Sequence, residues 1–62
     1  MAAELLRKLR GDRSLAAVAI RVGISVAALK AYESGERIPR DEIKSALETF
    51  YGTVIYSKEV VV

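Results

Sequence analysis

The chain has 62 residues, enough for one small domain, and a net charge of +2, with no cysteine and no histidine. A disulfide is therefore excluded, and only carboxylates remain as metal ligands. The sequence contains no recognisable catalytic constellation and no glycine-rich phosphate loop. We therefore expect no enzymatic activity, no cofactor and no small-molecule substrate. No run of 18 apolar residues and no signal-peptide pattern occurs, so we expect a cytoplasmic, nucleoid-associated protein without a membrane partner.

The first predicted helix spans residues 2–10, and its apolar face consists of Leu5, Leu6 and Leu9. Gly11 is its natural end. The link to the next helix is short, so that helix is expected to begin early.

The stretch from residue 14 to residue 34 predicts two helices joined by a tight corner. Ser14 and Ser25 can cap the two helix starts, because a serine hydroxyl accepts a hydrogen bond from an amide that has no partner within the helix. Gly23 ends the first of these helices and Gly35 the second, where a positive φ favours glycine. The inward-facing residues are Leu15, Val18, Ala19, Val22, Ala28, Leu29 and Tyr32. This arrangement is a helix-turn-helix, whose second helix can enter the DNA major groove.

The same stretch resembles the G-[VI]-S…[IL]…Y-E-x-G-x-R-x-P signature of phage-repressor and Cro-like (XRE-type) helix-turn-helix regulators. The matching residues are Gly23, Ile24, Ser25, Leu29, Tyr32, Glu33, Gly35, Arg37 and Pro39, preceded by similar residues at Leu6, Arg7, Leu9, Arg10 and Ser14. The resemblance covers residues 5 to about 52. It implies an all-α, compact, repressor-like domain of four to five helices over residues 1–52, and a role as a DNA-binding transcriptional repressor or regulator.

A fourth helix is expected to begin at or beside Pro39, which suits the first helical position because its missing amide would be unpaired there. Gly52 should end this helix. Residues 53–62 are rich in β-branched and aromatic side chains, which favour extended structure. Three outcomes are open for this tail: an extended segment over the core, a small hairpin, or a strand paired across a dimer axis. We favour a tail that packs on its own domain or on a second copy.

The resemblance also implies which residues face DNA bases, namely Val26, Ala27, Lys30 and Ala31 on the third helix. The family usually carries Gln, Arg, Asn or Ser at these positions. Valine and alanine cannot make the bidentate hydrogen bonds that distinguish guanine or adenine, and can only contact thymine methyl groups and exclude water. Lys30 is the one donor on this helix long enough to reach a base or a phosphate. The alternative is that the three apolar residues only support the helix or contact a protein.

Phosphate contacts are predicted from charge and from the helix starts. Residues 1–40 carry eight basic residues against four acidic ones, so the basic excess coincides with the helix-turn-helix. Helix N-termini favour anions because their amides point outward. The candidate phosphate contacts are Ser14, Ser25, Ser34, Arg37, Arg40, Arg13 and Arg21. The alternative for each arginine is an ordinary solvated side chain.

In the family, the residues that match Arg10 and Glu33 form an internal ion pair between the first helix and the end of the third. We therefore assign Arg10 and Glu33 a structural role.

Double-stranded DNA is the leading predicted partner, and residues 53–62 are the candidate contact for a homodimer. The alternative is a helix-turn-helix fold used for protein–protein interaction through the alanine-rich faces of the second and third helices, with Ile20 and Val26 exposed. Family residues retained mainly at structural positions would also fit an engineered or redesigned domain.

Overall fold

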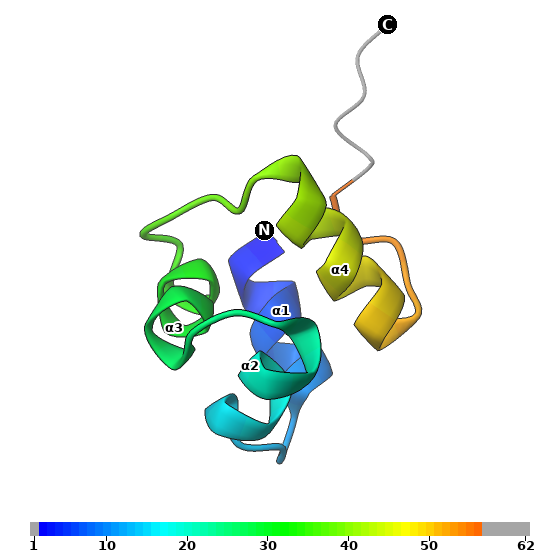
Figure 1. Cartoon of the computed structure of the whole chain (residues 1–62). Helices are drawn as coiled ribbons and strands as arrows, with labels where there is room; N and C mark the ends of the chain where they lie inside the picture. The colour runs from blue at the N-terminus through cyan, green and yellow to red at the C-terminus, as the bar shows by residue number, and fades with distance from the viewer. Residues whose placement is uncertain (1, 57–62) are drawn as a thin grey trace, which may run out of the picture.

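A computed structural model describes residues 2–56 as four helices. Their bounds are α1 Ala2–Arg10, α2 Leu15–Val22, α3 Val26–Ser34 and α4 Asp41–Tyr51. In Figure 1, α3 lies on the left and α4 on the right; α3 packs against both α1 and α2, and α2 also packs against α4. The described part of the chain contains no strand, so the predicted all-α class is confirmed, with four helices.

Local capping explains why α2 and α3 begin and end where they do. The Ser14 hydroxyl accepts a hydrogen bond from the Ala17 amide at 3.0 Å, and the Ser25 hydroxyl accepts one from the Ala28 amide at the same distance. Gly23 ends α2 with φ at 91°, a conformation that residues with a Cβ rarely adopt. These interactions lie within one helical turn, which is why the sequence predicted both helices.

The junction of α2 and α3 has the geometry of a helix-turn-helix. The two helices are bent by 106° relative to each other, within the range typical of this motif. Among the described residues, no single helix is long and apolar enough to span a membrane. The bent pair of α2 and α3 reaches the necessary length and apolar composition only when its two helices are counted together.

Every helix contributes to the core, and so does the segment after α4. The buried apolar residues are Leu6, Val18, Ala19, Leu29, Leu47 and Ile55. The other two leucines of α1, Leu5 and Leu9, are half-buried against this cluster. The core thus joins α1 to α3 and α2 to α4, and it fixes the position of the helix-turn-helix on the rest of the domain.

The predicted start of the fourth helix at Pro39 is wrong by two residues. α4 begins at Asp41, and Arg40 precedes it in an extended conformation with φ at −76° and ψ at 170°. Pro39 is instead buried in the loop before the helix, where its ring contributes to packing. Arg40 supplies no side-chain cap, but Asp41 and Glu42 place negative charge at the positive end of the helix dipole.

The segment after Gly52 folds back on the domain without forming a strand. Ile55 is buried, and the amides of Ile55 and Tyr56 donate to Glu48 Oε2 at 2.9 Å and 2.6 Å. Ile55 and Tyr56 thus pack on the core of their own domain, whereas Thr53 and Val54 are exposed. The rest of the predicted tail, residues 57–62, lies outside the described residues.

The position of Tyr56 predicts a loss of stability at alkaline pH. Burial, followed by the nearby carboxylate of Glu48, raises the pKa of Tyr56 from 10.0 to about 12. The folded state thus holds the phenol proton more tightly than the unfolded state, and this stabilisation is fully present below pH 10 and is lost as pH rises to about 12. In urea denaturation we expect Tyr56→Phe to lose less unfolding free energy than the wild type across this interval. Equal losses in the two proteins would contradict the prediction.

Candidate nucleic-acid interface

The outward face of α3 carries three of the four residues predicted to face bases. Val26 has 42% of its surface exposed, and Ala27 and Lys30 are also exposed. Their spacing of three and four residues places these side chains on one face of the helix. Ala31, the fourth candidate, is half-buried. The structure thus brings Val26, Ala27 and Lys30 together on the exposed face of α3, whereas Ala31 is only partly accessible.

This face presents a single charge. α3 contains one cationic side chain, Lys30, and one acidic side chain, Glu33. Glu33 is only 4% exposed and is therefore removed from the surface. The exposed face of α3 consequently has a positive charge and no negative one, although the sequence of the helix has a formal charge of zero.

Glu33 is held by two arginines of α1. Arg10 donates from Nε to Oε2 at 2.8 Å and from its NH2 group to Oε1 at 3.0 Å, which is a bidentate ion pair. The hydrogen bond to Glu33 raises the pKa of Arg10 above its ordinary value. Arg7 donates to the backbone carbonyl of Glu33, a contact that sequence reasoning missed. The repeated Leu-Arg pattern placed Arg7 near Arg10, but nothing in it specified a backbone carbonyl as the partner.

The candidate serines lie at helix ends, but each hydroxyl already has one hydrogen bond within the domain. Ser14 and Ser25 accept the capping bonds at the starts of α2 and α3, and both remain exposed. Each hydroxyl proton is still available for an outside acceptor, because a hydroxyl is both a donor and an acceptor. Ser34 differs, because its hydroxyl donates to the Ala31 carbonyl at 3.1 Å. Its hydroxyl oxygen therefore offers only acceptor positions while this bond persists.

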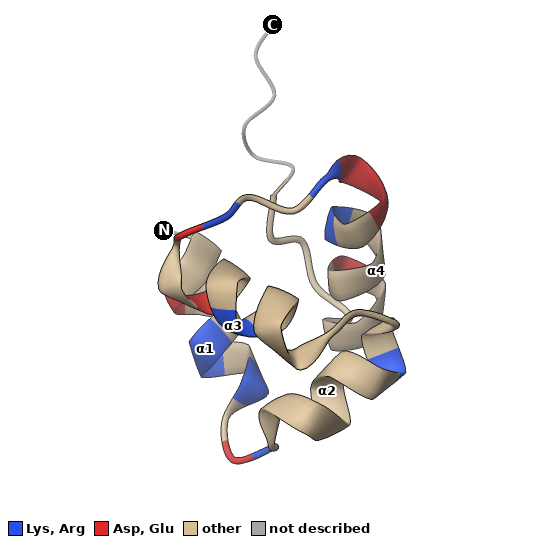
Figure 2. Cartoon of the chain, turned by 60° about the vertical axis from the view of Figure 1, so that its left-hand side comes forward, with Lys and Arg blue, Asp and Glu red and all other residues tan. Residues whose placement is uncertain are grey.

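Arg37 and Arg40 lie on the loop that joins α3 to α4, and both are exposed. Figure 2 shows the two basic segments of this loop, together with basic residues on α1 and α3. The Arg37 amide donates to the Ala31 carbonyl at 3.3 Å, so the backbone at Arg37 is tied to the last turn of α3. This hydrogen bond fixes the backbone of Arg37 at the C-terminal end of α3.

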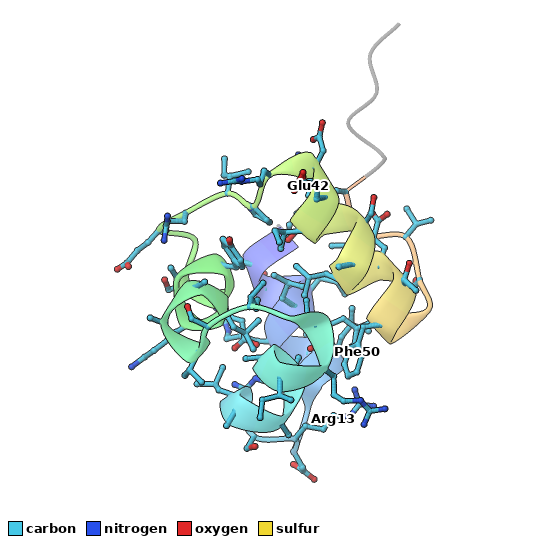
Figure 3. All side chains as sticks on the ribbon, in the orientation of Figure 1. Arg13, Glu42 and Phe50 are labelled. Atoms are coloured by element: carbon cyan, nitrogen blue, oxygen red, sulfur yellow. The ribbon has the colours of Figure 1, made fainter. Side chains whose placement is uncertain are left out.

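Arg13 and Arg21 border a different surface, a groove between α2 and α4 that also includes Phe50. Figure 3 shows Arg13 beside Phe50, with Glu42 at the other end of α4. The Arg13 guanidinium lies 5.6 Å from the centre of the Phe50 ring and 5.9 Å from that of Tyr51. These are distances of a cation–π interaction. Sequence reasoning missed this interaction, because it joins the link after α1 to the end of α4.

Tyr51 lies beside the Arg10–Glu33 ion pair. Burial, followed by the negative charge of Glu33, raises the pKa of Tyr51. Its hydroxyl is buried and has no hydrogen-bond partner among the described residues. The neutral phenol is therefore the form that the folded domain favours.

The described residues include no group of three or more acidic, histidine or cysteine side chains that could hold a metal ion.

A family model described as a helix-turn-helix domain matches residues 2–54. The chain thus belongs to this helix-turn-helix family, in agreement with its resemblance to phage-repressor and Cro-like regulators, and this membership indicates DNA binding in general terms. Comparisons with curated proteins and with solved structures gave no significant match.

The ion pair predicts a double-mutant cycle with strong coupling. Arg10→Met leaves the buried carboxylate of Glu33 without its main partner, and we expect a loss of about 3 kcal/mol, near the low end for such pairs because the Arg10 side chain is 22% exposed. The double variant Arg10→Met/Glu33→Leu should lose less than the sum of the two single losses, measured by urea denaturation.

Lys8→Met is the control, because Lys8 is an exposed cation on the same helix and should change stability by less than about 0.5 kcal/mol. Additive losses in the double variant would contradict the predicted coupling.

Proposed function

We propose that the protein binds double-stranded DNA with α3 in the major groove and acts as a transcriptional repressor or regulator. One observation carries the proposal: the single carboxylate of α3 is buried against Arg10, so the outward face of the helix carries Lys30 as its charge. A carboxylate exposed on this face would be repelled by the phosphates on both sides of the groove, so its burial favours close approach to DNA.

The dimensions of α3 suit this role. A helix with its side chains is about 10–12 Å across, and the major groove is about 12 Å wide. The nine residues of α3 span roughly 13 Å at 1.5 Å per residue, which corresponds to about four base pairs.

Val26 and Ala27 would contact thymine methyl groups, and Lys30 would reach a base acceptor or a phosphate. Ala31 would make a smaller contact, because it is half-buried. We therefore expect modest base specificity, with a preference for thymine-containing steps.

The phosphate backbone would be held at the ends of α3. Ser25 and the amides at the helix start would contact one strand, and Arg37 and Arg40 would contact the backbone beyond the helix end. Ser34 would donate to a phosphate there only after its hydroxyl leaves the Ala31 carbonyl. Ser14 at the start of α2 would add to the first group. Arg13 and Arg21 border the α2–α4 groove, and they would reach only phosphates that flank α2.

A dimer would strengthen binding, because one module of this size contacts only about 600–1,000 Å². We propose residues 53–62 as the dimer contact, with the two recognition helices about 34–36 Å apart on successive turns of DNA. Ile55 is buried within its own domain, whereas Val54 is 62% exposed. Among the described residues of the tail, Val54 is therefore the one suited to contact a second copy.

A protein–protein interaction is the second candidate function. Ile20 on α2 is 75% exposed, and it lies in the same groove as Ala17 and Phe50. An apolar contact of this kind would be almost insensitive to salt, whereas DNA binding through phosphates weakens steeply as salt rises.

The deciding experiment is selection from a randomised duplex pool near physiological salt, followed by sequencing of the retained DNA. We expect an enriched motif, and two symmetric halves in that motif would indicate a dimer. Retention without a motif would reduce the function to non-specific DNA binding. No retention by the folded protein would contradict DNA binding and favour the protein-interaction function.

Arg37→Ala should weaken binding to all duplexes by a similar factor, because a phosphate contact carries no sequence information. The slope of log affinity against log salt should fall by about 1, measured by fluorescence anisotropy over a salt series. Lys8→Ala is the control, because Lys8 is an exposed cation on α1 and is not a predicted DNA contact. An effect of Arg37→Ala confined to one sequence would contradict the assignment to a phosphate.

Lys30→Ala should change the ranking of duplexes if the ammonium group contacts a base. We expect a loss of discrimination of about 1 kcal/mol at one position of the motif, the low end for a base contact. Competition binding with single-base variants of the selected duplex would measure this. An unchanged ranking would assign Lys30 to the backbone.

A further inference from the structure

A cavity of about 360 Å³ lies between the start of α1, the α3–α4 loop, α4 and the segment after it. We call it the Tyr32–Tyr56 cavity, and its lining includes Ala3, Tyr32, Arg37, Pro39, Lys44 and Tyr56. Figures 1 and 2 both show the α3–α4 loop passing the start of α1. Its volume is near the lower end of the range for small-molecule sites.

The charges around this cavity have one sign. Among the described residues 2–56, Arg37 and Lys44 are the ionised side chains that line it, and no carboxylate does. Glu48, whose charge acts on Tyr56, uses Oε2 to accept hydrogen bonds from the amides of Ile55 and Tyr56. A cavity with two cations and no lining anion favours an anionic ligand, since the attraction is stronger where water is partly excluded.

The uncharged lining suits a flat apolar body. Tyr32 and Tyr56 are half-buried and present aromatic rings, Pro39 is buried, and Ala3 is small. The Lys44 ammonium lies 5.4 Å from the centre of the Tyr56 ring, so the cation stands beside an aromatic wall. The Tyr56 phenol is neutral at physiological pH and can donate a hydrogen bond.

We propose that the Tyr32–Tyr56 cavity binds a small aromatic carboxylate. The carboxylate accepts hydrogen bonds from Lys44 and Arg37, which are charge-assisted and therefore strong. The aromatic ring of the ligand packs between the two tyrosines and against Pro39.

Occupation of the cavity has a consequence that rests on the proposed DNA binding. Arg37 lines the cavity and is also a proposed phosphate contact. A bound carboxylate and a DNA phosphate compete for this one guanidinium, so the ligand weakens binding to DNA.

The first test uses the full chain without DNA and titrates it with benzoate, with amide chemical shifts followed by NMR. We expect saturable shifts at Tyr32, Gly35 and Tyr56, and binding of the uncharged analogue benzamide that is at least about ten-fold weaker. Lys44→Met should weaken benzoate binding by a similar factor and leave benzamide unaffected, whereas Lys8→Met should change neither. Equal binding of benzoate and benzamide, or shifts confined to other residues, would overturn the proposal.

A second variant covers the case in which Lys44→Met does not fold. Ala3→Leu fills the cavity from the start of α1 and retains both cations, so it should abolish benzoate binding. Unchanged benzoate binding in Ala3→Leu would overturn the proposed location.

The second test adds the selected duplex and measures its affinity with and without saturating benzoate. We expect weaker DNA binding in the wild type and no effect of benzoate in Arg37→Ala. Benzoate binding to a protein that retains no DNA would contradict the proposed function and leave the cavity assignment standing. DNA binding that is insensitive to bound benzoate would overturn the competition for Arg37.

Discussion

The bidentate ion pair between Arg10 and Glu33 is the interaction on which the rest of the structure depends. It joins α1 to the last turn of α3, and Arg7 adds a hydrogen bond to the Glu33 carbonyl. Arg10 also donates to the carbonyl of Arg13 at 2.7 Å, which ties the link between α1 and α2 to the same centre. Burial of the Glu33 carboxylate is unfavourable by itself, because the charge loses its water. Two well-aligned hydrogen bonds offset that loss only in one relative position of the helices, so the pair selects the orientation of α3.

The same ion pair determines what α3 presents to a partner. Without Arg10, a carboxylate near the end of the helix would oppose a phosphate backbone. With Glu33 buried, Lys30 is the charge that α3 exposes, and the small side chains of Val26 and Ala27 allow close approach. A structural interaction and the proposed DNA surface are thus produced by one pair of residues.

The α3–α4 loop connects the proposed DNA surface with the cavity. The Arg37 backbone is anchored to α3, while the buried ring of Pro39 holds the loop against the domain. Lys44 and Tyr56 also line the cavity, and the Tyr56 backbone amide donates a hydrogen bond to the Glu48 carboxylate. A domain this small can bury only about 60% of its unfolded surface, so residues after the last helix contribute to its core. Ile55 makes that contribution, and the position of the cavity wall follows from it.

The sequence by itself determined the helix-turn-helix, because each signal acts within one helical turn. Ser14 and Ser25 cap the helices that follow them, and Gly23 and Gly35 end those helices in the left-handed conformation. The pairing of Arg10 with Glu33 came from family resemblance, since no local rule joins two residues on different helices. Only the tertiary structure showed where α4 begins: its first residue is Asp41, and Pro39 is buried in the loop before it. It also separated Arg13 and Arg21 from the cations near α3, and it placed Lys44 beside Tyr56. These contacts join residues that are distant in the chain, and their geometry depends on how all four helices pack together.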